Sequence, residues 1–178
     1  MSTTPRAPRT AVVVGNPRPA SRTLQAAGLV VRELTGAEPE LVVDLATVGA
    51  GLLDWADPEV GHLVEQVAAA ELVVVASPTY KATYSGLLKL FLDRFAAGQL
   101  TGITVPLMLG GGPAHGLAPD VSLAPLLTHL GGIVPTGGLY VLDRQHDDPA
   151  AYAAWLDRAR PVVTALLHSA RTFQGAPA

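Results

Sequence analysis

The chain has 178 residues, which fits one domain of ordinary size, and its 49% hydrophobic and 15% charged residues exclude a disordered protein. A net charge of −3 gives no electrostatic reason to expect nucleic acid or an anionic membrane as partner. The absence of cysteine excludes disulfides, thiolate catalysis and cysteine-ligated metals, and is compatible with the cytoplasm, where we expect the protein.

The first residues contain no apolar segment of the kind found in signal peptides. The weakly charged stretch from Phe95 to Leu142 is interrupted by proline and glycine too often to form a membrane-spanning helix. We expect a flexible N-terminus over residues 1–9, one domain over residues 10–170, and a flexible C-terminus over residues 171–178.

Five short apolar runs alternate along the chain with segments of helical character. The runs predict strands over Thr10–Gly15, Glu40–Leu45, Leu72–Ala76, Ile103–Gly110 and Gly137–Leu142. Helices are expected from Ser21 to Gly36, from Asp57 to about Ala70, over Ser85–Phe95, over Ser122–Gly131 and from Asp148 to Ala170, with a loop between residues 46 and 56.

The predicted strands are continuously apolar and do not alternate between apolar and polar residues. This pattern is typical of parallel strands that are covered by helices on both faces, so we predict an α/β fold. In such open sheets, ligands bind at the carboxyl ends of the strands. The loops after strands one, three and four are therefore the places to look for a site.

The first of these loops, "GNPRPASRT", leads from a strand into a helix N-terminus. Free backbone N–H groups there attract anions, Arg18 and Arg22 add charged donors, and Ser21 or Thr23 can cap the helix and donate a hydroxyl. The pattern indicates a phosphate site, although it matches neither a Walker A loop nor a dinucleotide fingerprint. The alternative is an ordinary capped loop with two solvated arginines.

The second loop, "SPTYKATYSG", combines aromatic and polar residues at the end of a buried strand. Pro78 restricts the geometry of Ser77, Tyr80 can lie flat over a planar ligand, and Lys81 can offer a positive charge. The alternative is that Tyr80 and Tyr84 fill core or interface space.

The third loop, "LGGGPAHG", has three successive glycines, Gly110, Gly111 and Gly112, which leave room for a flat ligand or a close backbone. His115 is its only titratable residue. A tight turn and a structural histidine are the alternatives. The other histidines have no metal-ligand spacing, and no nucleophile elbow is present, so we predict neither a metal site nor hydrolytic chemistry.

Together, "GNPRPASRT", "SPTYKATYSGLLKLFLD" and "VPLMLGGGPAH" resemble the flavodoxin-like NADPH-dependent FMN reductases, over most of the chain. Asn16 and Thr83 depart from the serines usual at those positions in the family. The resemblance implies a flavodoxin-like three-layer sandwich with a five-stranded parallel sheet of order 2-1-3-4-5. It also implies a homodimer or homotetramer.

The resemblance also implies a binding site for FMN. It places the FMN phosphate on Arg18, Ser21, Arg22 and Thr23, the isoalloxazine edge against Pro78, Thr79, Tyr80 and Lys81, the other boundary of the ring at Gly110, Gly111 and Gly112, and His115 near the flavin or nicotinamide.

The function we expect is hydride transfer from NADPH or NADH to FMN, chemistry that the cofactor itself carries. Reduced FMN would then leave to supply a partner monooxygenase, or a tightly bound FMN would reduce quinones or azo compounds. A flavodoxin-type electron carrier and a module for another phosphorylated ligand are the alternatives. On the helix Ser85–Phe95 the apolar arc is wider than one sheet contact needs, and we expect Leu90, off the main stripe, to contact another subunit. The alternative is a helix that is deeply buried in its own domain.

Overall fold

The computed structural model describes residues 8–174, with side chains described as far as Ser169. Most of the two predicted flexible ends lies outside this range. Where the ranges overlap, the backbone of Arg9 exchanges hydrogen bonds with Glu71, and the last helix continues to Gln174. Among the described residues, no helix is both long enough and apolar enough to cross a membrane.

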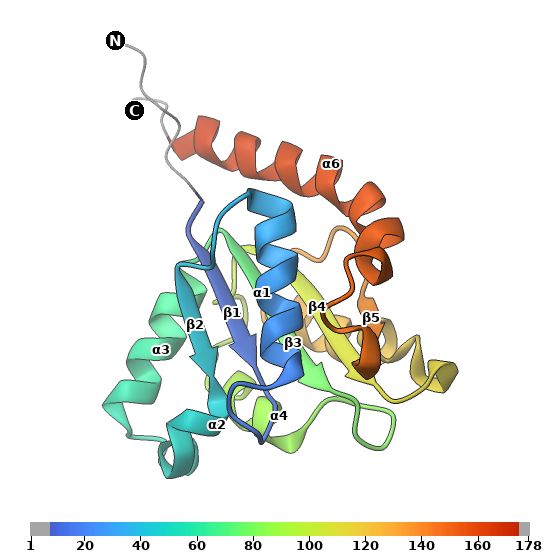
Figure 1. The fold of residues 1–178 in the computed structure, drawn as a ribbon. Helices are drawn as coiled ribbons and strands as arrows, with labels where there is room; N and C mark the ends of the chain where they lie inside the picture. The colour runs from blue at the N-terminus through green and yellow to red at the C-terminus, as the bar shows by residue number, and fades with distance from the viewer. Residues whose placement is uncertain (1–7, 175–178) are drawn as a thin grey trace.

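The centre of the molecule is a five-stranded sheet in which every neighbouring pair is parallel (Figure 1). The strand order is β2-β1-β3-β4-β5, which confirms the predicted topology. The strands are β1 (Thr10–Val14), β2 (Leu41–Asp44), β3 (Leu72–Pro78), β4 (Ile103–Gly110) and β5 (Leu139–Leu142). β1, β3 and β4 are buried along their whole length, as their continuous apolar sequence predicts.

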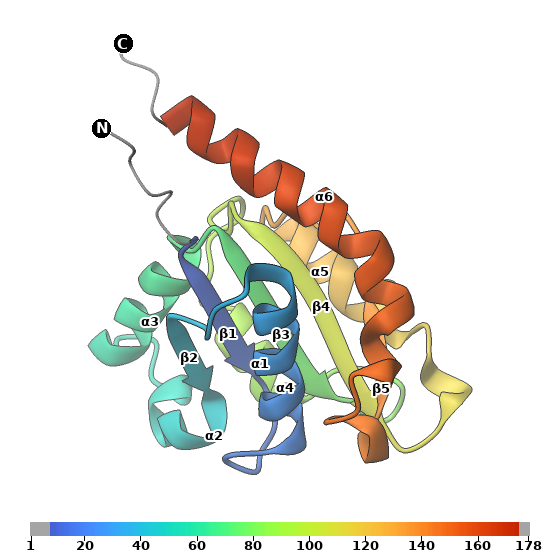
Figure 2. The same ribbon diagram turned by 45° about the horizontal axis from the view of Figure 1, so that its top comes forward.

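Helices cover both faces of the sheet, which gives three layers. α1 (Arg22–Thr35) and α6 (Ala150–Gln174) pack side by side on one face, with α6 running along β4 and β5 (Figure 2). The other face carries α2 (Leu45–Val48), α3 (Pro58–Ala68), α4 (Gly86–Leu92) and α5 (Ala124–His129). Alternate residues of β1 enter the two cores: Val12 and Val14 face α1, and Ala11 and Val13 face α3 and α4.

Three of the predicted helix starts are confirmed by capping contacts. Ser21 accepts a hydrogen bond from the N–H of Leu24 (3.3 Å), Asp57 accepts from Glu59 and Val60, and Ser85 accepts from Leu88 (3.1 Å). These three caps fix where α1, α3 and α4 begin. Since α1 and α4 both start at the carboxyl edge of the sheet, their caps also shape the loops of the candidate site.

Several predicted boundaries differ from those in the structure. The expected loop after β2 contains α2 and the 3₁₀ segment Gly49–Leu53, because Asp44, the last residue of β2, also caps a helix there. β3 extends to Pro78 because its pairing with β4 continues to Leu109. β5 begins only at Leu139, after Gly137 with its φ of 69°, and a π-helical turn (Pro119–Leu123) precedes α5.

Gly15, directly after β1, is required by packing inside the domain. A Cβ atom at this position would lie 2.3 Å from the Cβ of Leu88 on α4. We predict that Gly15→Ala lowers the free energy of unfolding by about 1–3 kcal/mol, because either α4 or the end of β1 must move.

Urea denaturation measures this loss. Gly61→Ala is the matched control, since Gly61 lies inside α3 with open space at its Cβ position and alanine favours a helix. That control should gain stability, and an unchanged Gly15→Ala variant would contradict the packing argument.

Candidate functional site

Three loops meet at the carboxyl edge of the sheet, where they surround a hollow of about 560 Å³. They are the predicted loops after β1, β3 and β4, and a residue just after β5 completes the wall. The hollow is lined by Asn16, Arg18, Pro19, Ala20, Ser21, Arg22, Pro78, Thr79, Tyr80, Leu109, Gly110, Gly111 and Asp143. Its position is the one at which ligands bind in open parallel sheets.

The loop after β1 is held in shape by two side chains. Asn16 donates from Nδ2 to Oγ1 of Thr23 (2.9 Å) and accepts the backbone N–H of Arg18 at Oδ1 (2.9 Å). Asp44 accepts the N–H of Ala20 (2.9 Å), a residue with a left-handed φ of 50°. Asn16, a departure from the family pattern, therefore has a structural role: it folds the loop around the start of α1.

Hydrogen-bond donors that could bind an anion remain unpaired at the end of the hollow that the loop after β1 forms. The N–H groups of Arg22 and Thr23, in the first turn of α1, have no acceptor among the described residues, nor does the Arg18 guanidinium. Arg22 lies 2.6 Å from Asp143, measured from Nη1 to Oδ2. The free N–H groups, the positive end of α1 and Arg18 suit a phosphate.

The loop after β3 forms a small hairpin at the rim. Tyr80 and Thr83 exchange backbone hydrogen bonds of 2.9 and 3.1 Å, and the two residues between them, Lys81 and Ala82, have φ values of 51° and 67°. Two successive positive φ angles define a type I′ turn, which normally selects Asn-Gly. Neither Lys nor Ala indicates such a turn, so the sequence did not predict it. Backbone strain of this kind gathers at functional sites.

Thr79 carries an unpaired polar atom at the site. Its Oγ1 is buried and has no hydrogen-bond partner among the described residues, while its N–H donates to the Leu109 carbonyl (2.6 Å). Buried hydroxyl groups are nearly always paired. A hydroxyl that lacks a partner inside the protein and lies beside a hollow fits a group that bonds to a ligand.

Two buried serines join the first loop to the second. Ser85 donates from Oγ to the Gly15 carbonyl and accepts the N–H of Leu88. Ser77 donates to the Pro78 carbonyl (2.8 Å) and accepts the N–H of Ser85 (2.9 Å). The end of β1, the end of β3 and the start of α4 therefore form one connected unit beneath the hollow.

The three glycines of the loop after β4 differ in what surrounds them. A Cβ atom on Gly110 would lie 1.9 Å from Oη of Tyr140, so this glycine is required by the protein itself. Gly111 and Gly112 have open space at their Cβ positions, and Gly112 accepts a hydrogen bond from Tyr140 (2.6 Å). At Gly111, which lines the hollow, the missing side chain leaves room for a ligand.

The structure brings eight of the twelve predicted residues to the hollow: Arg18, Ser21, Arg22, Pro78, Thr79, Tyr80, Gly110 and Gly111. The other four, Thr23, Lys81, Gly112 and His115, are absent from its lining. Thr23 is buried beneath the loop, and His115 is exposed in a 3₁₀ turn. Sequence reasoning missed Asp143, which could have been found because it follows directly after a strand whose carboxyl end reaches the same edge.

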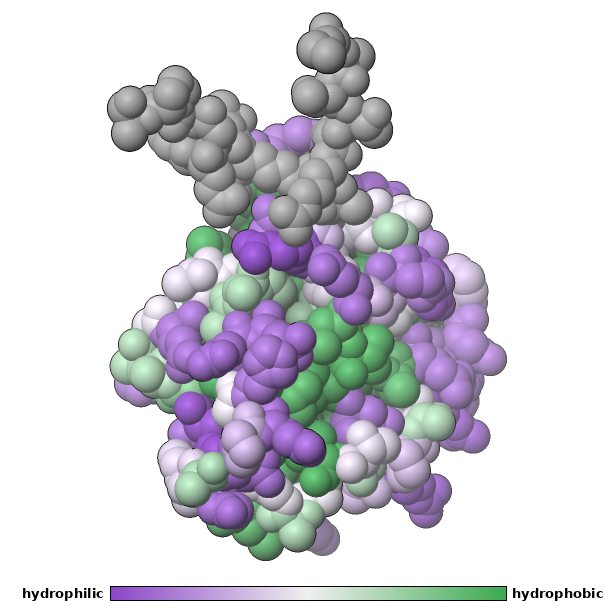
Figure 3. Space-filling view, turned by 90° about the vertical axis from the view of Figure 1, so that its left-hand side faces the viewer, coloured by the Kyte–Doolittle hydropathy of each residue, from purple (hydrophilic) through white to green (hydrophobic). Residues whose placement is uncertain are grey.

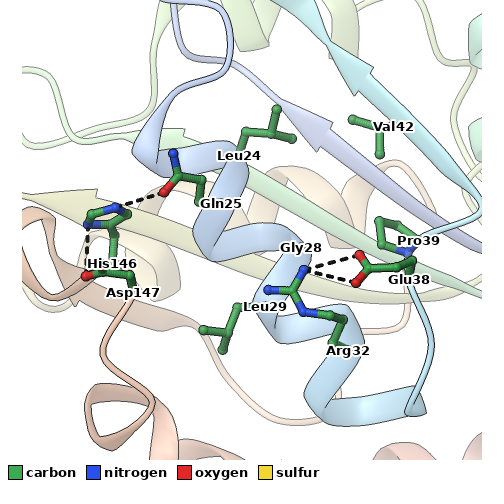
Figure 4. Close-up of a pocket in the computed structure, with 10 residues that line it drawn as sticks. All are labelled: Leu24, Gln25, Gly28, Leu29, Arg32, Glu38, Pro39, Val42, His146 and Asp147. Atoms are coloured by element: carbon green, nitrogen blue, oxygen red, sulfur yellow. Dashed lines mark hydrogen bonds and ion pairs between the residues drawn. The ribbon is translucent and has the colours of Figure 1, made fainter.

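A second hollow, of about 460 Å³, is lined by residues of α1, by residues in and just before the edge strand β2, and by His146 and Asp147 after β5 (Figure 4). Its main polar side chains pair with one another: Arg32 with Glu38 (3.2 Å), and Gln25 with His146 (3.0 Å). Figure 3 views the molecule from this edge of the sheet, where apolar residues gather and where Val42 is 46% exposed. Since its polar groups are satisfied and its lining contains no residue of the three loops, we do not assign it as the site.

Neighbours among solved structures support the fold. The apo form of the NADH:FMN oxidoreductase EMOB superimposes with a TM-score of 0.75, covering 90% of this chain and 88% of that one at 24% identity. An oxidoreductase from Corynebacterium diphtheriae gives a TM-score of 0.74 at 23% identity, with 92% and 97% covered.

Sequence comparison is more specific. The model of the family described as NADPH-dependent FMN reductase matches residues 8–147. An FMN reductase (NADPH) from Escherichia coli K12 is 32% identical over 77% of this chain and 74% of its own length, and one from Pseudomonas aeruginosa is 33% identical over 78% of each. The NADH-dependent FMN reductase SfnF of Pseudomonas putida is 29% identical over 88% of this chain and 91% of its own. With that match over most of its length, and with the three loops meeting at the edge where the fold binds ligands, the chain belongs to the NADPH-dependent FMN reductase family.

Proposed function

We propose that the protein is an NAD(P)H-dependent FMN reductase that transfers a hydride from the nicotinamide to the flavin, with FMN bound in the hollow at the carboxyl edge of the sheet. The observation that carries this proposal is that three loops meet around the hollow in a chain of this family. One loop offers hydrogen-bond donors for an anion, and the other two form an open, partly polar wall. FMN, when bound, supplies the redox chemistry. The residues of the chain bind and orient the two nucleotides.

The first loop would hold the phosphate. Arg18 offers an unpaired guanidinium, and the N–H groups of Arg22 and Thr23 point out of the first turn of α1 without acceptors among the described residues. Ser21 lines the same end and Thr23 supports the loop from below. These groups bind a dianion through charge-assisted bonds and the helix dipole.

The second and third loops would hold the ring. Thr79 offers the unpaired hydroxyl, and Gly111 leaves the opposite wall open to a flat group. Tyr80, half exposed at the rim, can stack on a planar ligand, and with His115 it remains our candidate for positioning the nicotinamide. The acidic residue of the lining, Asp143, is paired with Arg22, which fits a reaction in which the protein orients its substrates and does not itself transfer protons.

The direct experiment is to record the visible spectrum of the purified protein and then to follow oxidation of NADPH and NADH, with and without added FMN. Relatives are named for each nucleotide, so both are needed. We expect oxidation, and a lack of it under every flavin condition would refute the proposal. Dependence on added FMN would favour supply of reduced flavin to a partner monooxygenase. Activity without added FMN would favour a tight flavoprotein that reduces quinones or azo compounds.

Arg18→Ala tests the phosphate end. Because a charge-assisted hydrogen bond contributes about 1.5–3 kcal/mol, we expect FMN to bind roughly tenfold to a hundredfold more weakly, while riboflavin, which has no phosphate, binds as before. Quenching of flavin fluorescence measures both affinities. Arg158→Ala, on the exposed surface of α6, removes the same charge away from the hollow as a control. Equal weakening of both flavins would contradict the assignment.

We also propose a homo-oligomer that assembles through the exposed side of α4. Leu90 is 39% exposed there, and Arg94, one turn further on, stacks on Trp55 with its guanidinium 5.3 Å from the ring. Trp55 and Leu53, 70% and 69% exposed, extend this apolar surface. Exposed tryptophan and leucine beside a stacked arginine are typical of protein interfaces.

We propose that the protein is located in the cytoplasm, since a chain without cysteine needs no oxidising environment.

Leu90→Glu tests this surface, because a charge buried between subunits without a partner opposes association. We expect light scattering after gel filtration to give a smaller assembly, with an unchanged circular dichroism spectrum. Val162→Glu is the control: Val162 is 40% exposed on α6, on the opposite face of the sheet. An unaltered mass of the Leu90→Glu variant would refute the interface.

A further inference from the structure

We infer that Asp143 is an internal competitor for the phosphate end of the flavin site: its carboxylate holds Arg22 and so keeps FMN exchangeable. This inference rests on the proposed function, because it needs FMN to bind with its phosphate at the first loop. It adds a residue that determines how tightly the flavin binds.

The two arginines that line the hollow differ in their partners. Arg18 has no partner for its guanidinium among the described residues, whereas Arg22 forms an ion pair of 2.6 Å with Asp143. Asp143 is the one acidic residue in the lining of the hollow. Two cationic side chains therefore face the proposed phosphate position, and one of them is already neutralised by a residue 121 positions away in the chain.

The position of Asp143 is fixed by several contacts, which distinguishes it from an incidental surface pair. It follows directly after Leu142, which pairs with Gly110 in the sheet. His146, three residues further, bonds through Nδ1 to the Asp143 carbonyl (3.1 Å) and through Nε2 to Gln25 of α1 (3.0 Å; Figure 4). The phenol of Tyr152 donates to the His146 carbonyl (2.5 Å).

These contacts fasten the segment after β5 to the first turns of α1 at two points. Arg22 and Gln25 are three residues apart on α1, and their partners Asp143 and His146 are three residues apart as well. Side chains with this spacing lie on the same side of a helix. The carboxylate is thus held beside Arg22 by a second contact, and it stays near this position when Arg22 turns toward another anion.

A phosphate that binds at the first loop must share Arg22 with the Asp143 carboxylate or draw Arg22 away from it. In both cases a fixed negative charge remains near a group that carries close to two negative charges, and the repulsion lowers the affinity. Arg22 and Asp143 are 58% and 45% exposed at their side chains, so salt screens part of the effect. Because affinity differences within one site appear mostly in the dissociation rate, the expected result is faster release of FMN.

Asp143→Asn removes the charge and keeps the shape of the side chain. We expect FMN to bind about tenfold more tightly at low salt and to dissociate more slowly, with a smaller gain at high salt. Riboflavin affinity should not change. Fluorescence titration gives the affinities, and stopped-flow dilution of the preformed complex gives the release rates.

Asp157→Asn is the matched control. It removes the same charge from an exposed residue of α6 that lies outside the lining of the flavin hollow. This variant should bind FMN like the unmodified protein. Tighter binding in both variants would mean a general effect of net charge, and this would overturn the role of Asp143.

The remaining outcomes separate this inference from the proposed function. Unchanged or weaker FMN binding by Asp143→Asn overturns the competitor role, and weaker binding would instead make Asp143 a residue that orients Arg22. If Arg18→Ala leaves the preference for FMN over riboflavin intact, the phosphate assignment fails. If neither NADPH nor NADH is oxidised, the reductase function fails, whatever Asp143 does.

Discussion

The candidate site depends on the close approach of α4 to the end of β1. Gly15 lets the backbone of α4 come within contact distance, and the Ser85 hydroxyl bonds to the Gly15 carbonyl at the same point. This contact brings the loop after β1 next to the loop after β3, although Gly15 and Ser85 are 70 residues apart in the chain. Without this contact, a parallel sheet would still form, but the loops at its ligand-binding edge would not be joined beneath the hollow.

The residues that line the hollow above this contact are of two kinds. The first loop presents charge: a free arginine and the open N–H groups of a helix start. The second and third loops are mostly uncharged: they offer one unpaired hydroxyl and a glycine that leaves open space. A nucleotide cofactor has the same division, a charged end and a flat end, and this correspondence connects the geometry with the activity named for the related reductases.

Local signals in the sequence predicted the parallel sheet, the helix caps and the three loops of the site, whereas the strand order and the residues of the lining came from the family resemblance. Continuous valine runs mark buried parallel strands, and Ser21, Asp57 and Ser85 mark helix starts. What the sequence did not predict depends on contacts between distant segments. The Arg22–Asp143 pair joins positions 121 apart, and the turn at Lys81 and Ala82 is imposed by its surroundings against the preferences of both residues. The need for glycine at position 15 also becomes clear only from the position of Leu88, which a Cβ atom there would meet.

The uncovered edge of the sheet has a consequence for how the protein behaves in concentrated solution. Val42 of β2 is 46% exposed, and one edge of the strand is unpaired within the described sheet. An open edge of this kind invites pairing with another chain, which leads to aggregation. β2 is only four residues long and is preceded by Pro39, which has no N–H to donate, and by the charged Glu40. Shortness, proline and charge together discourage such pairing at this edge of the sheet.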